Sequence, residues 1–181
     1  MTNKNRTDTT YKSIATLLIV FGFISFSYAS PISNNNLVML ANNQRANYKI
    51  NQLNVSDQLN QAASAKARAM FSQNAFEHTL PSGVTPWDFI NNSGYRYEIA
   101  GENLAINFQT AEGTTSAWMN SPSHRANILS NKYEDIGIAV ESGQINGKNT
   151  VLVVEMFGKR SNSIVDKVVD MFGNLRYLFG L

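Results

Sequence analysis

Residues 117–129 read "AWMNSPSHRANIL". An apolar, helix-like segment runs into a proline, and the proline is followed by a histidine, an arginine and an apolar pair. Because proline is tolerated at a helix start but not in a helix interior, the pattern predicts that one helix ends and another begins at Pro122. We expect Ser123 to cap the second helix and His124 to lie in its first turn. Arg125 should point away or pair with an acid.

Two further patterns place an ionisable residue at an expected change of backbone direction. His124 is one of only two histidines in the chain. The other, His78, lies in "FEHT" at residues 76–79, just after a predicted helix. Glu102 lies in "GENL" at residues 101–104, in or beside a predicted strand. Such turns and strand ends commonly carry functional side chains.

These three patterns, in this order, resemble the CAP superfamily of SCP-like domains, and more narrowly its cysteine-free bacterial branch. The match covers residues 34–158. The resemblance implies a three-layer α-β-α sandwich with a small antiparallel sheet, and a groove lined by two histidines and two acidic residues. By motif these are His78, His124 and Glu102. The position of the second acid holds Ser121 here, so the acidic set is incomplete.

The resemblance supports two hypotheses about function. The first is a binding module whose groove of His78, Glu102 and His124 takes a lipid, a glycan or a protein. The alternative is a metal-assisted hydrolase of a peptide or a cell-envelope polymer, with Zn²⁺ held by the two histidines and Glu102 as the catalytic base. Two protein ligands make a weak zinc site, and the missing acid weakens the hydrolase hypothesis. The resemblance covers zinc-bound and metal-free proteins alike, and catalysis stays open.

Hydrophobic periodicity predicts an α+β fold, with helices first and strands later. An alanine-rich apolar stripe on the second helix indicates close packing against another element, which we expect to be the final hairpin. Asn146-Gly147 supplies the turn of that hairpin, in a loop slightly longer than the minimum. Trp87 and Trp118 are expected in the core. The predicted helices cover residues 34–46, 56–73 and 86–93 and a stretch from 110, and the predicted strands cover 95–106, 135–142 and 150–157.

The N-terminal 29 residues are typical of an export signal. A basic start precedes the apolar stretch 14–26, and Ser27-Tyr28-Ala29 offers small residues for a signal peptidase. We expect cleavage after Ala29, a short linker at 30–33, and a periplasmic or secreted protein. The alternative is an uncleaved anchor, although the apolar stretch is short for a membrane span.

Composition excludes several classes of protein. Apolar residues make up 43% of the chain and there is no cysteine, so a packed core has to form without disulfides and thiol catalysis is excluded. Residues 1–29 hold three of the 15 basic and one of the 13 acidic residues, so the remainder has no formal net charge. Without a basic patch, nucleic acid is not an expected partner.

The segment 161–181 is a predicted amphipathic helix outside the family resemblance. Its apolar face needs cover from the domain surface, a second copy of the chain or a membrane. Asp166 and Asp170 balance Lys167 and Arg176 on its polar face. Helices drawn to anionic lipid usually carry a basic excess, so we expect packing against protein rather than membrane.

Overall fold

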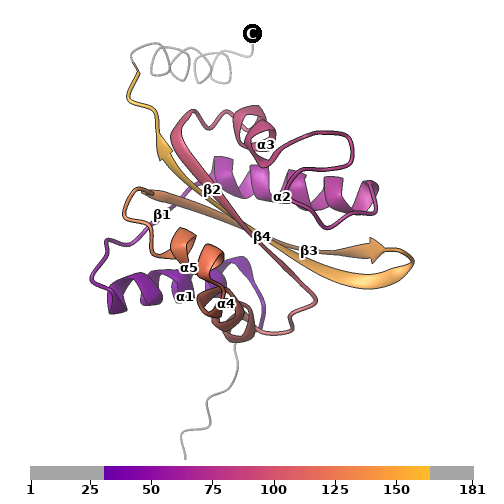
Figure 1. Cartoon of the computed structure of the whole chain (residues 1–181), viewed down its shortest axis with the longest axis horizontal. Coiled ribbons are helices and arrows are strands. Elements are labelled where there is room, and N and C mark those ends of the chain that lie inside the picture. Colours follow the sequence, from indigo (N-terminus) through magenta and orange to yellow (C-terminus); the bar gives the residue numbers. More distant parts are fainter. Residues whose placement is uncertain (1–30, 164–181) are drawn as a thin grey trace, which may run out of the picture.

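The computed structural model describes residues 31–163 (Figure 1). The predicted signal peptide, its cleavage site and residues 164–181 of the predicted C-terminal helix lie outside the described residues. Within 31–163, no helix combines the length and the hydropathy needed to cross a bilayer.

The described chain forms a sheet between two layers of helices, which confirms the predicted α+β sandwich (Figure 1). The strand order is β1-β3-β4-β2; β3, β4 and β2 are antiparallel, and the short β1 adds a parallel edge that was not predicted. The elements are α1 (Asn34–Asn47), β1 (Asn54–Val55), α2 (Asp57–Ser72), α3 (Pro86–Asn92), β2 (Tyr97–Ile106), α4 (Ala111–Asn120), α5 (Pro122–Ile128), β3 (Asp135–Ile145) and β4 (Lys148–Arg160).

Hydroxyl side chains begin most of the helices. The Ser56 hydroxyl accepts from the Leu59 N–H at the start of α2, and Thr110 does the same for Gly113 at the start of α4. These bonds satisfy N–H groups that have no partner within the helix. Helix α3 begins at Pro86, as predicted, and Thr85 is its N-cap. The Thr85 N–H donates to the Asp88 carboxylate at 2.8 Å.

The β3–β4 hairpin closes with two residues. Ile145 pairs with Lys148, so only Asn146 and Gly147 lie in the loop. Both have positive φ, at 51° and 72°, which is the combination that a tight two-residue turn requires. The longer loop that we expected from the sequence is therefore wrong, because the left-handed pair turns the chain without a further residue.

The sheet is buried on both faces. The α2 side of the sheet and the α1/α4/α5 side each carry a separate apolar cluster. A Cβ atom at Gly137 of β3 would lie 2.3 Å from the Leu59 backbone, so α2 approaches the strand closely, as its alanine stripe indicated. Trp118 is buried on the opposite side, whereas Trp87 is 38% exposed and the expectation of a core position for it is wrong. Its ring lies 6.4 Å from that of Tyr97 at the surface.

Candidate functional site

His78 and Glu102 form a hydrogen-bonded pair. His78 follows α2 in a loop, and Glu102 lies in β2, an edge strand of the sheet. The His78 Nδ1 and Glu102 Oε1 atoms are 2.6 Å apart, a length typical of a charge-assisted bond. The His78 side chain is 60% exposed and the Glu102 side chain only 1%. The arrangement presents an imidazole to solvent on top of a buried carboxylate.

The buried Lys66 of α2 supports this pair from below. Its ammonium group donates to the His78 carbonyl oxygen, and it lies 5.7 Å from the centre of the Phe89 ring. Burial lowers the pKa of Lys66, and the negative charges of Glu102 and Glu77 oppose that effect. Sequence reasoning missed this residue. The available signal was a lysine inside the alanine stripe of α2, where a solvated charge is not expected.

Burial and the hydrogen bond between them shift the pKa values of His78 and Glu102. Burial raises the pKa of Glu102, while its hydrogen bond to His78 and the charge of Lys66 counteract the rise. The hydrogen bond to Glu102 raises the pKa of His78. The proton of the pair therefore stays on His78 to a higher pH than on an unpaired histidine. Among the described residues, Glu102 Oε2 has no hydrogen-bond partner.

His124 lies in the first turn of α5, as predicted, but the cap position belongs to Ser121 rather than Ser123. The correction follows from Pro122, which occupies the first helical position and leaves the preceding residue as the cap. The Ser121 hydroxyl lies 2.8 Å from His124 Nδ1. The position that lacks the second acid therefore supplies a neutral hydrogen-bonding group to this histidine.

The two histidines have opposite electrostatic settings. Burial lowers the pKa of His124, and the positive charge of His78 lowers it further. The site therefore shifts His78 toward the cationic form and His124 toward the neutral form. That both rings line one open groove with Glu102 remains a prediction. Arg125 pairs with no acid among the described residues, and its guanidinium lies over the Tyr48 ring at 5.7 Å.

Side chains of α4, of α5 and of the connection that follows α5 bond to the edge of β2. Alternate carbonyl oxygens of the strand accept hydrogen bonds from an indole, an amide and a phenol: Leu104 from Trp118 at 3.0 Å, Glu102 from Asn127 at 3.0 Å and Ala100 from Tyr133 at 3.3 Å. An uncovered edge strand could pair with another chain, and these bonds occupy its outward acceptors. They also hold α5, and with it His124, against the strand that carries Glu102.

Asn103 of β2 links this strand to α5 and to β4 through hydrogen bonds. Its amide nitrogen donates to the His124 carbonyl at 3.2 Å and to Glu155 Oε2 at 2.9 Å, and its oxygen accepts from Asn127 at 2.9 Å. Glu155 in β4 is fully buried, and burial raises its pKa to about 8 although the Asn103 bond acts in the opposite direction. Sequence reasoning missed Asn103, Asn127 and Glu155. The only signal for Glu155 was a single charge within the apolar strand.

The two histidines supply at most a two-ligand zinc site. Among residues 31–163, no group of three or more histidine, cysteine, aspartate or glutamate side chains is placed to hold a metal ion. Nδ1 of His78 bonds to Glu102 and Nδ1 of His124 to Ser121, so Nε2 of each ring is the nitrogen that a metal ion could reach. That the two rings hold Zn²⁺ together remains a prediction.

An NMR titration of the imidazole C–H signals tests this electrostatic description. We expect the pKa of His78 above, and that of His124 below, the ordinary histidine value. In Glu102→Gln the pKa of His78 should fall, because burial remains and the carboxylate is gone. In His78→Ala the pKa of His124 should rise, because a neighbouring positive charge is removed. The exposed Glu98 of the same strand provides a control, Glu98→Gln, that should leave both values in place. An unchanged His78 in Glu102→Gln contradicts the pair.

Comparisons by sequence and by structure relate this chain to the same group of known proteins. The sequence profile of the CAP family, described as the cysteine-rich secretory protein family, matches residues 38–157. The protein YkwD of Bacillus subtilis is 38% identical over 110 residues, which is 60% of this chain and 43% of YkwD, so the chain spans less than half of that relative.

Solved structures show the same fold. An outer surface protein from Borrelia burgdorferi has a TM-score of 0.62 at 25% identity, over 74% of this chain and 100% of that chain. An extracellular protein containing an SCP domain from Bacillus anthracis has a TM-score of 0.61 at 22% identity, over 70% of this chain and 40% of that chain.

Proposed function

Because the chain belongs to the CAP, or cysteine-rich secretory protein, family, we propose that it is an exported ligand-binding module whose site is built on His78, Glu102 and His124. The observation that carries the proposal is the pair in which an exposed imidazole lies on a buried carboxylate. Burying a carboxylate is costly, and such perturbed groups cluster at functional sites.

The chemistry of the site suggests what the ligand offers. A protonated His78 donates through Nε2, while a neutral His124 donates or accepts according to its tautomer. A ligand with a polar or anionic acceptor group would match the first imidazole and one with a hydroxyl or amide the second. Lipid head groups, glycans and protein surfaces all present such groups, so the ligand belongs to one of these classes.

Two observations support export. The relatives in solved structures include an outer surface protein and an extracellular protein. The apolar stretch 14–26, behind a basic start, provides a signal of the required kind. We propose that the protein acts in the periplasm or outside the cell.

The hydrolase hypothesis has less support. A catalytic zinc site generally uses three protein ligands and an open position. The described part of the chain contains no such group of side chains. We assign no reaction to Glu102.

Binding experiments with site variants test the proposal. The purified protein is presented to phosphatidylglycerol vesicles, to a neutral glycan and to an immobilised extract of surface proteins, and affinities are measured by surface plasmon resonance. For the probe that binds, we expect His78→Ala and Glu102→Gln each to weaken binding about tenfold or more, the loss of one charge-assisted contact. Glu98→Gln, on the same strand, is the matched control. Equal affinity for all variants would exclude this site as the binding surface.

A further inference from the structure

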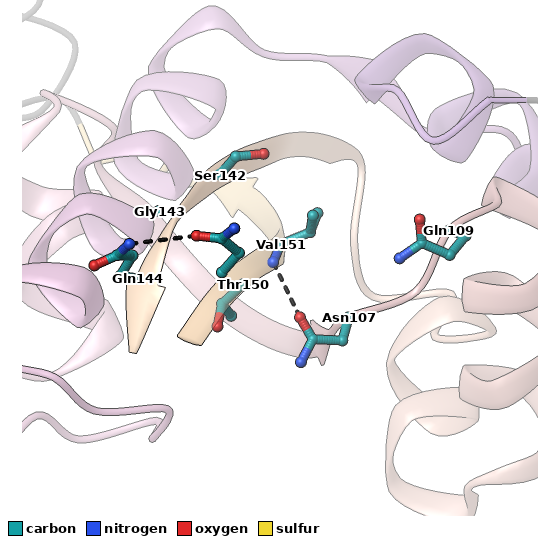
Figure 2. A pocket seen from close by; sticks show the side chains of 8 residues that line it. Asn107, Gln109, Ser142, Gly143, Gln144, Thr150 and Val151 are labelled. Carbon is teal, nitrogen blue, oxygen red and sulfur yellow. Dashed lines mark hydrogen bonds between the residues drawn. The ribbon is translucent and has the colours of Figure 1, made fainter. Parts of the chain in front are cut away.

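A hollow of about 510 Å³ lies beside the turn end of the β3–β4 hairpin (Figure 2). The ends of three strands build it, and none of the residues that line it is charged. It contains neither of the histidines nor Glu102, so it is separate from the site described above. The polar side chains that matter for its chemistry are Asn107, Gln109, Ser142, Gln144 and Asn149.

The wall at the end of β2 is fixed by a two-way bond between main chain and side chain. The Asn107 N–H donates to the Val151 carbonyl at 2.8 Å, and the Val151 N–H donates to the Asn107 side-chain oxygen at 3.1 Å (Figure 2). Asn107 has φ 61°, a left-handed conformation that asparagine tolerates better than most residues. Within residues 31–163, no hydrogen bond involves the side-chain NH₂ of Asn107, so its two donors are available to a ligand.

The hairpin side of the hollow is also held in place. Gln144 donates to Asn149 across the hairpin at 3.3 Å (Figure 2). The turn is tied to the end of α2 by a 2.5 Å bond from the Asn74 amide to the Asn146 side chain. A Cβ at Gly143 would lie 2.8 Å from the Phe71 ring, so the strand rests directly on α2. The polar groups therefore project from a pre-organised surface, which reduces the entropy cost of binding.

Several polar groups in the hollow are not used by the protein. Within residues 31–163, no hydrogen bond involves the Gln109 amide or the Ser142 hydroxyl. In the same residues, the side-chain oxygen of Gln144 accepts no hydrogen bond and the side-chain NH₂ of Asn149 donates none. The charged neighbours Glu141 and Lys148 are not among the residues that line the hollow, and the Glu141 carboxylate is engaged by Ser64 and Arg68 of α2.

This surface therefore offers both donors and acceptors and no counter-charge. A charged ligand would lose hydration here without gaining an ion pair. A neutral ligand that carries hydroxyl and amide groups would satisfy both kinds of polar group. An unpaired side-chain amide such as that of Gln109 can exchange two hydrogen bonds with an acetamido group, since each amide has a donor and an acceptor.

We propose that this hollow at the ends of β2, β3 and β4 is a second binding site, and that it takes a neutral saccharide bearing acetamido groups. Tri-N-acetylchitotriose is the probe. In ¹H–¹⁵N NMR spectra of the purified full chain, the side-chain NH₂ signals of Gln109, Gln144 and Asn149 should shift saturably. The absence of saturable shifts up to about 10 mM, an affinity below about 3 kcal/mol, overturns the proposal.

Variants and related sugars make the test specific. The double variant Gln109→Ala/Gln144→Ala should weaken binding at least about tenfold, whereas the control Glu98→Gln, which lies outside the hollow, should leave it within about twofold. Both glutamines are exposed, so unchanged backbone spectra should confirm that the double variant is folded. Maltotriose, which lacks acetamido groups, and the de-acetylated, charged trisaccharide should each bind at least about fivefold more weakly. Equal binding of either sugar, or unaltered binding by the double variant, overturns the assignment.

Discussion

Val153→Asp is expected to abolish folding of the domain. Val153 is fully buried in β4, in the centre strand pair, and its cluster includes Trp118, Ile138 and Phe157. The side chains of that cluster are apolar and offer a carboxylate no partner. An unpaired buried charge costs several kcal/mol, and the lost apolar packing adds ~2 kcal/mol, against a total stability of ~5–15 kcal/mol for a domain of ordinary size. Circular dichroism and a thermal scan should show an unfolded or insoluble protein.

A matched substitution separates burial from strand propensity. Val55→Asp places the same residue in a strand, but at a position that is 58% exposed. This variant should fold and should lose no more than ~1 kcal/mol in urea denaturation, the range of surface substitutions. A folded Val153→Asp protein with normal stability would show that the β4 face turned toward α1 and α4 is not the core face.

Glu155→Gln is expected to stabilise the protein, and more so at higher pH. Burial raises the pKa of Glu155 to about 8, from an ordinary value of 4.5. Between these values the folded state holds a proton that the unfolded state releases, so wild-type stability falls as the pH rises, by at most ~1.4 kcal/mol per pH unit. Glutamine keeps the acceptor for Asn103 and has no proton to lose. The advantage of the variant should be small near pH 4.5 and reach several kcal/mol at pH 8.

Urea denaturation of both proteins at pH 5 and pH 8 measures this difference. Other titrating groups cancel, because they are the same in the two proteins. The exposed Glu98 gives the control Glu98→Gln, which should show no comparable growth of the difference with pH. A Glu155→Gln variant that is less stable than wild type at pH 8 would indicate an ionised, well-solvated Glu155 in the native state.

Much of the architecture was predictable because local rules and tertiary packing agree. The caps Ser56 and Thr110, the start at Pro86 and the alternation of β3 each satisfy backbone groups or bury side chains within a few residues. Errors arose where a single residue decides the local geometry. Ser121 rather than Ser123 caps α5, because Pro122 occupies the first helical position.

The candidate site was less predictable from the sequence. Motifs identified the two histidines and Glu102, and the structure adds the bond between His78 and Glu102. Lys66 and Glu155 escaped notice because buried charges are rare and neither belongs to a motif that names it. Their roles depend on partners 12 or more residues away, such as the bonds from Lys66 to His78 and from Asn103 to Glu155.

The sequence by itself determined the helices, the hairpin and the family, because these depend on periodicity, caps and motifs within short stretches of chain. It also determined that no cysteine stabilises the fold. Only the tertiary structure explains why the motifs contain these residue types. Trp118, Asn127 and Tyr133 each bond a carbonyl of the same edge strand, and a Cβ at Gly101 would lie 2.4 Å from the Tyr133 hydroxyl. Such contacts depend on the distance between segments after folding, which residue order does not contain.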